Sequence, residues 1–159
     1  IREAINQYGG NVHPNIYLIH GSLNSVEMHG LYTDKKIKAF VTHSKGEGFG
    51  RPLLESALCE IPIICPNFGG YLDFLNENNS YLVNGSLEEV GLTNNLFCEN
   101  AKWMQIDEDE SSKAMLDVFQ NYDSHKSKIS NNLNEISSNF SSKSAFEKYK
   151  NIFRNIDTL

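Results

Sequence analysis

Apolar residues recur along the chain in two patterns, and these predict its elements. Nearly continuous apolar runs of three to seven residues are typical of strands buried on both faces. The strands are expected over 15–20, 37–43, 61–65 and 81–83. Helices are expected over about 25–33, 52–60 and 71–77. Strands that alternate with helices through short links predict an α/β fold, with a Rossmann-like parallel sheet and helices on both faces.

The second half of the chain has a different pattern. Residues 85–108 show no clean period and are expected to form a long irregular connection. Three apolar stripes at helical spacing follow and predict C-terminal helices. The last stripe comprises Phe146, Tyr149, Ile152, Phe153 and Ile156.

Composition and charge exclude several classes of function. The chain has 159 residues and a formal net charge of −6, which argues against nucleic acid and anionic membranes as partners. Cysteines and histidines lack metal-ligand spacing, and the acidic run 107–109 is interpreted as a helix cap, so no metal site is expected. The cysteines are expected to be unpaired, with Cys59 and Cys65 packed in the core. Reduced thiols favour a cytoplasmic protein, and so does a sequence in which we identify no membrane span or signal peptide.

The segment 42–57 carries the candidate chemistry, because it joins a strand to a helix through a glycine-rich loop. Gly48 and Gly50 allow the backbone to approach a ligand closely. The N–H groups of Phe49, Gly50 and Arg51 are expected to point out of the helix N-terminus. That arrangement suits a diphosphate or sugar hydroxyls.

Two carboxylates flank this loop. Glu47 lies in the loop and Glu55 lies about one turn into the helix, with seven residues between them. We expect both to face one cleft at the carboxyl end of the 37–43 strand, where they would accept hydrogen bonds from sugar and ribose hydroxyls. The alternative is an ordinary strand–loop–helix connection with Glu55 on the surface.

The stretch 47–70, EGFGRPLLESALCEIPIICPNFGG, resembles the E-x7-E signature of retaining glycosyltransferases with the GT-B fold, in particular the family-four group (glycosyl transferases group 1). The resemblance implies that a nucleoside diphosphate sugar is the donor, that no metal or other cofactor is needed, and that the acceptor is a sugar, lipid-linked sugar or protein. Glu55 would hold the ribose and Glu47, the catalytic residue, would contact the donor sugar. The remaining donor-binding residues would be Gly48, Phe49, Gly50 and Arg51 through backbone N–H groups, and His20, Gly21 and Leu23 around the base.

The same resemblance implies a division of the chain. Residues 1–105 would form a partial nucleotide-sugar-binding domain that lacks its first strand, and 106–159 a helical segment that packs on it. Because Ile1 begins what reads as the end of a helix over 1–8, we expect upstream sequence with an N-terminal acceptor domain. Basic residues that neutralise the diphosphate in such enzymes would lie there, and Arg51 stands where the family usually has Leu.

Three expectations follow for function. The isolated chain should not catalyse transfer, and part of the apolar stripe on the last helix should be exposed. His43 and Ser44 would flank the pocket, although a packed strand-end histidine is the other interpretation of His43. The alternatives to a transferase are an inactive sugar-nucleotide-binding or regulatory module and a GT-B-fold sugar-nucleotide epimerase.

Overall fold

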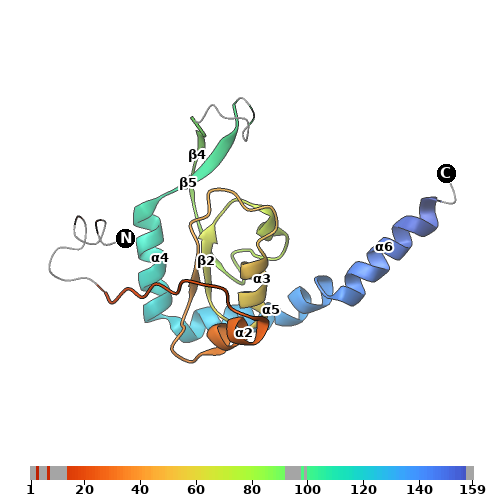
Figure 1. Ribbon diagram of the computed structural model, residues 1–159, viewed down its shortest axis with the longest axis horizontal. Coiled ribbons are helices and arrows are strands. Elements are labelled where there is room, and N and C mark those ends of the chain that lie inside the picture. The colour runs from red at the N-terminus through yellow and green to blue at the C-terminus, as the bar shows by residue number, and fades with distance from the viewer. Residues whose placement is uncertain (1–2, 4–6, 8–13, 92–97, 99, 157–159) are drawn as a thin grey trace.

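The computed structural model describes residues 3, 7, 14–91, 98 and 100–156 (Figure 1). A parallel sheet of three strands in the order β1-β2-β3 forms its centre. The strands are β1 (Phe40–Val41), β2 (Ile63–Pro66) and β3 (Tyr81–Val83). The helices are α2 (Ser25–Thr33), α3 (Arg51–Leu58), the 3-10 turn η1 (Gly70–Asp73), α4 (Glu108–Gln120), α5 (Tyr122–Asn139) and α6 (Ser142–Ile156). The predicted α/β class is therefore confirmed, while the helix end expected over 1–8 falls, apart from residues 3 and 7, outside the described residues.

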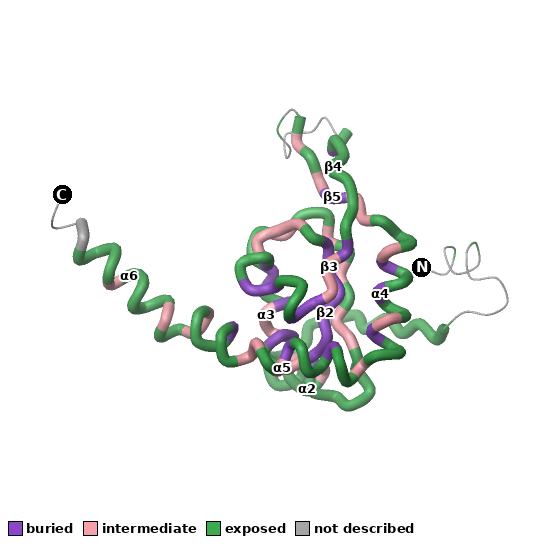
Figure 2. The backbone as a smooth tube through the Cα atoms, turned by 180° about the vertical axis from the view of Figure 1, so that it is seen from behind, coloured by how far each residue is buried: buried purple, intermediate pink, exposed green. Residues whose placement is uncertain are grey.

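Helices cover both faces of the sheet. Successive side chains of β2 point to opposite faces, and all of them are buried, so each face is covered. Ile63 and Cys65 pack in one cluster with residues of α3, η1 and α5. Ile64 packs in a second cluster with Val83 of β3 and with α4. The continuous apolar run 61–65 thus serves two hydrophobic layers, which Figure 2 shows as buried backbone at the centre of the molecule.

One predicted strand is absent and another is shorter than expected. Residues 15–20 are extended but pair with no strand among the described residues, and Tyr17 is 84% exposed. An apolar run gives a segment strand propensity, but a ladder also needs a partner edge for its N–H and C=O groups. Of the expected strand over 37–43, only Phe40 and Val41 pair, and they pair with β2.

The connection expected to be irregular contains an antiparallel hairpin instead. Its strands are β4 (Gly85–Glu89) and β5 (Lys102–Ile106), in the register Gly85↔Ile106. Every residue of β4 is exposed. Because the strand has no buried face, its sequence lacks the alternation of apolar and polar residues that would have predicted it. The hairpin projects from the carboxyl edge of the sheet (Figure 1).

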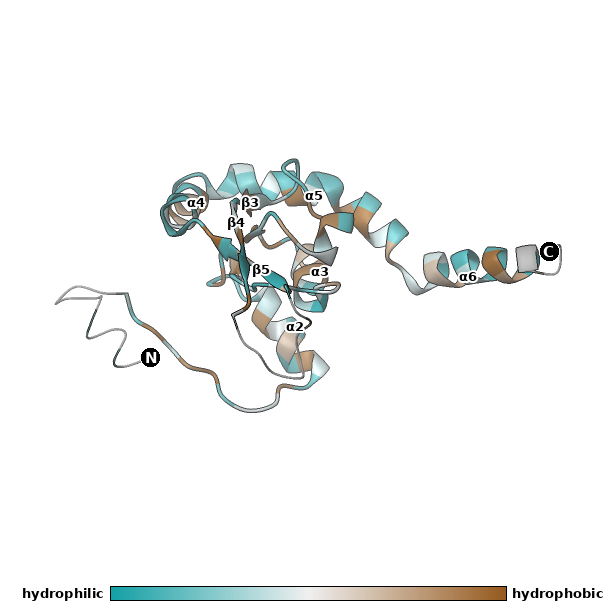
Figure 3. Cartoon of the chain, turned by 90° about the horizontal axis from the view of Figure 1, so that it is seen from above, coloured by the Kyte–Doolittle hydropathy of each residue, from teal (hydrophilic) through white to brown (hydrophobic). Residues whose placement is uncertain are grey.

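The last helix, α6, leaves the body of the molecule, and Figure 3 shows it from above with apolar bands along it. Phe146, Tyr149, Ile152 and Phe153 are all more than half exposed. The expectation that part of this stripe is exposed is therefore confirmed for those four residues; the side chain of Ile156 lies outside the description. Nowhere in the described part of the chain does a helix combine the length and apolar character that crossing a membrane requires.

Candidate functional site

The loop 42–50 leads from β1 into α3 and is shaped by glycine. Gly50 is the N-cap of α3, with φ +82° in the left-handed region that favours glycine. A Cβ there would lie 2.8 Å from Leu53 Cδ1 and 3.2 Å from the buried ring of Tyr71. No side chain caps this helix end, so its first N–H groups are available to a ligand.

A second glycine turn closes on the first. The Gly70 N–H donates to the Glu47 carbonyl at 2.9 Å, and a side chain at Gly70 would overlap the carbonyl of Gly48. Tyr71 is fully buried beneath them. The two ends of the segment 47–70 are therefore in contact, and each fixes the backbone of the other.

Tyr71 holds the second turn from below. Its hydroxyl donates to the carbonyls of Pro66 at 3.0 Å and Phe68 at 2.6 Å. Burial, followed by the nearby Cys65 and Glu47, raises the pKa of Tyr71. The phenol therefore remains a protonated donor at neutral pH, and the turn keeps its shape.

A cavity of about 460 Å³ opens between α2 and α3. Its lining comprises Leu23, Ser25, Met28, His29, Tyr32, Arg51, Glu55, Leu58 and Cys59. Arg51, Glu55 and Leu58 of α3 recur at four- and three-residue spacing, so they lie on one face of the helix about one turn apart, and the C-cap residue Cys59 follows Leu58. Along this face the lining changes from cationic through anionic to apolar.

The charges of this cavity are only loosely paired. Arg51 Nη2 lies 3.5 Å from Glu55 Oε1, with side chains that are 83% and 43% exposed. A pair this exposed contributes little and is easily exchanged for a ligand. Burial, and then the Glu55 carboxylate, raise the pKa of Cys59, so the thiol beside it remains neutral.

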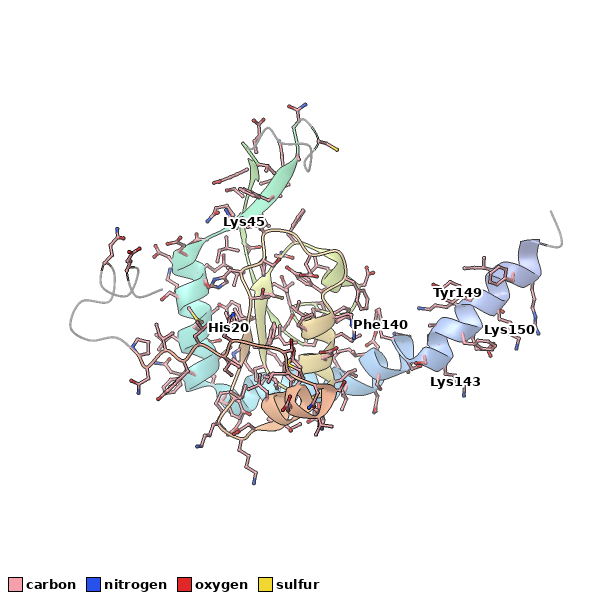
Figure 4. The ribbon with its side chains drawn as sticks, in the orientation of Figure 1. His20, Lys45, Phe140, Lys143, Tyr149 and Lys150 are labelled. Carbon is pink, nitrogen blue, oxygen red and sulfur yellow. The ribbon has the colours of Figure 1, made fainter. Side chains whose placement is uncertain are left out.

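The structure brings only some of the predicted site residues together. Leu23 and Glu55 share the α2–α3 cavity, whereas Glu47 is half-buried in the loop and outside its lining. Gly21, with φ +131°, makes the turn before α2, and His20 lies exposed on the extended segment that precedes it (Figure 4). A common cleft for Glu47 and Glu55 remains a prediction.

The side chain of Phe49 does not line this cavity. Its ring centroid lies 5.5 Å from that of Phe74 and 6.0 Å from that of Phe140 at the end of α5. Phe49 therefore anchors the glycine loop to the helical layer, and its backbone is the part available to a ligand.

A second cavity, of about 340 Å³, lies on the other side of the loop. Its lining comprises His43, Lys45, Met104, Gln105, Ile106, Glu108, Ser111 and Met115. His43 is exposed, in contrast to a packed strand-end histidine, and its Nε2 lies 2.7 Å from Ser111 Oγ. Sequence reasoning missed the other polar members, Lys45 of the loop, Gln105 of β5, and Glu108 and Ser111 of α4, because only the fold brings these three elements together.

The hairpin is fastened to the loop beside this cavity. The Met104 N–H donates to the Lys45 carbonyl at 2.9 Å, and Lys45 Nζ lies 4.3 Å from the centroid of the Trp103 ring. Figure 4 shows Lys45 where the hairpin meets the body of the molecule. The backbone two residues before Glu47 is thus held by β5.

Asp107 and Cys65, two further residues considered in the sequence, have structural roles. The Asp107 carboxylate accepts from the Glu110 N–H at 3.0 Å, which confirms the helix-cap interpretation of the acidic run. Cys65 is buried, as predicted, and burial raises its pKa to about 12, whereas Cys59 is only half-buried. The described residues include no group of three His, Cys, Asp or Glu side chains able to hold a metal ion.

Comparison with known proteins identifies a family for this chain. The family model for glycosyl transferases group 1 matches residues 11–115. The match spans the glycine loop, α3 and every residue that lines the two cavities. No curated protein is a significant match to the chain.

Proposed function

Because the chain belongs to the glycosyl transferases group 1, a family of enzymes that transfer glycosyl groups, we propose that its donor is a nucleoside diphosphate sugar held in the α2–α3 cavity. We propose further that the chain supplies the donor side of a retaining GT-B enzyme, with the glycosyl group transferred without inversion at the anomeric carbon. The resemblance of residues 47–70 to the E-x7-E signature supports both parts.

The observation that carries the donor assignment is the order of side chains along α3. Arg51, Glu55 and then Leu58 with Cys59 follow one another at intervals of about 5–6 Å, the rise of one helical turn. A nucleoside diphosphate presents anionic phosphates, a ribose with vicinal hydroxyls and an apolar base face in the same order. In this assignment Glu55 accepts hydrogen bonds from the ribose, and Leu23 contacts the base.

The glycine loop supplies the diphosphate end of the site. The uncapped N-terminus of α3 presents N–H groups and the positive end of the helix dipole, both of which favour an anion. The Arg51 guanidinium, which is mostly exposed, has room to leave Glu55 and approach the phosphates. We propose that these protein groups, in place of a metal ion, neutralise the leaving diphosphate.

The reaction proposed here is a substitution at the anomeric carbon. The bond from that carbon to the phosphate oxygen breaks, a bond to the acceptor hydroxyl oxygen forms, and the hydroxyl proton passes to the departing phosphate. Glu47 contacts the donor sugar, and the rest of catalysis is placement and charge stabilisation. A separate general base is not needed.

The remainder of the proposal concerns the acceptor. We propose that residues 1–105 and 106–159 keep the roles of donor-binding domain and helical segment, and that most of the acceptor site lies on another domain. The apolar face of α6, exposed at Phe146, Tyr149 and Phe153, is the surface we expect to meet that domain. The chain by itself would then bind the donor nucleotide without turning it over.

Calorimetric titration of the chain with uridine, guanosine and adenosine diphosphates tests the proposal. We expect saturable binding of at least one nucleotide, weakened by Glu55→Gln and unchanged by Glu77→Gln, an exposed carboxylate outside the lining of the cavity. Absence of binding for all three nucleotides would refute the donor assignment.

A further inference from the structure

The second cavity is built where three elements meet at the carboxyl end of β1. His43 and Lys45 come from the loop, Met104, Gln105 and Ile106 come from β5, and the remaining lining comes from α4. Its volume of about 340 Å³ is within the range of small-molecule sites. None of its lining residues belongs to the donor cavity.

The chemistry of the lining favours a neutral, hydroxyl-rich ligand. The Lys45 ammonium and the Glu108 carboxylate oppose each other in sign, so the cavity selects neither anions nor cations by charge alone. Gln105, Ser111 and His43 add groups that donate or accept hydrogen bonds. Two methionines and Ile106 supply apolar surface for the C–H face of a sugar ring.

Part of this polar surface is already ordered. His43 Nε2 and Ser111 Oγ are hydrogen bonded at 2.7 Å, although the two residues lie 68 positions apart. Lys45 is held by the Met104 N–H and by the Trp103 ring. Groups fixed before a ligand arrives lose less entropy on binding it.

The position of the cavity relates it to the donor site. The same loop contributes Lys45 to this cavity and runs into Arg51 of the other, with Glu47 between them. The helices that complete the two cavities, α3 and α4, cover opposite faces of the sheet. A transferase must bring the reacting atoms of two substrates to within about 3–3.5 Å, and the loop 42–50 is the segment that connects the two cavities, since it lines the second cavity and leads directly into Arg51 of the donor cavity.

We infer that the cavity lined by His43, Lys45, Gln105, Glu108 and Ser111 is a subsite for the acceptor saccharide. The inference rests on the proposed function, since it takes the α2–α3 cavity as the donor site. It assigns the β4–β5 hairpin a role in acceptor recognition, and it adds a contribution from this chain to a site that lies mostly on another domain.

The test is an NMR titration of the ¹⁵N-labelled chain with the methyl glycosides of glucose, galactose, mannose and N-acetylglucosamine. We expect saturable shifts at the amides of Lys45, Gln105 and Ser111 with at least one glycoside. Glu108→Gln and Gln105→Ala should each weaken that binding about five- to tenfold, the effect of losing one hydrogen bond. Matched controls are Glu89→Gln and Ser86→Ala, exposed hairpin residues outside the lining, which should leave the affinity unchanged.

A second arm repeats the titration with a saturating nucleoside diphosphate sugar. Glycoside shifts that persist identify an acceptor subsite, whereas shifts that disappear mean that the cavity takes the donor sugar and overturn the inference. The inference is also overturned if no glycoside gives a saturable shift, or if Glu108→Gln and Gln105→Ala bind the glycoside as tightly as wild type. A nucleotide that still binds through Glu55 in that case leaves the proposed function standing, and a nucleotide that fails to bind refutes the proposed function separately.

Discussion

Replacing Glu55 by glutamine should weaken nucleotide binding while leaving the fold intact. The substitution keeps the shape of the side chain but removes its charge, and the Arg51–Glu55 pair that it breaks is exposed. Loss of that pair should change the free energy of unfolding by less than about 0.5 kcal/mol. An effect on binding is therefore attributable to the ligand.

The expected magnitude follows from the exposure of the carboxylate. A hydrogen bond to a charged group contributes about 1.5–3 kcal/mol. Because the Glu55 side chain is 43% exposed and has to be released by Arg51, we expect about 1–2 kcal/mol, or about 5–30-fold in Kd. Glu47→Gln should leave nucleotide affinity unchanged and lower turnover in a catalytically competent enzyme.

The assay compares each nucleoside diphosphate with its dideoxy form, which lacks both ribose hydroxyls. Wild type should bind the dideoxy form more weakly, and Glu55→Gln should not weaken it further, because both changes remove the same interaction. Equal affinity of wild type and Glu55→Gln for the complete nucleotide would refute the role given to Glu55. Additive losses would show that Glu55 contacts a different part of the ligand.

Three other predictions concern the fold around the site. Gly70→Ala should destabilise the protein by about 1–3 kcal/mol in urea unfolding, because its Cβ overlaps the facing glycine loop; Gly30→Ala, in open space on α2, should be neutral or stabilising, and equal stability of the two variants would contradict the packing argument. Asp107→Ala should cost about 0.5–2 kcal/mol by removing the cap of α4, and Asp107→Asn should retain most of the stability. Hydrogen bonds from Asn121 and His125 lower the pKa of Asp117 below 3.8. The stability that Asp117 contributes should therefore be present above that pH and lost as the pH falls through the folded-state pKa. Acid unfolding of Asp117→Asn should lack this component, and identical pH profiles of the two proteins would contradict it.

The sequence predicted the elements whose formation depends on local features. The continuous apolar run of β2 indicated a strand buried on both faces, and the helix expected over about 52–60 corresponds to α3. The cap at Asp107 followed from acidic residues before a helical stripe. In each case one segment of sequence contains both the signal and the structure.

The errors and omissions depend on distant parts of the chain. The apolar run 15–20 has strand propensity, but no described strand pairs with it. Conversely, β4 pairs with β5 although its sequence has no apolar–polar alternation that would predict a strand. The hydrogen bond between His43 and Ser111 joins residues brought together only by the fold. The resemblance of residues 47–70 to a family signature indicated Glu55 and the glycine loop, but the second cavity had no such signal.

A crystal structure of the chain with a bound nucleoside diphosphate tests the central claim most directly. The account predicts ribose hydroxyls within hydrogen-bonding distance of the Glu55 carboxylate and phosphate oxygens at the N–H groups of Gly50 and Arg51. A nucleotide bound away from α3, for example in the cavity beside His43 and Ser111, would contradict it.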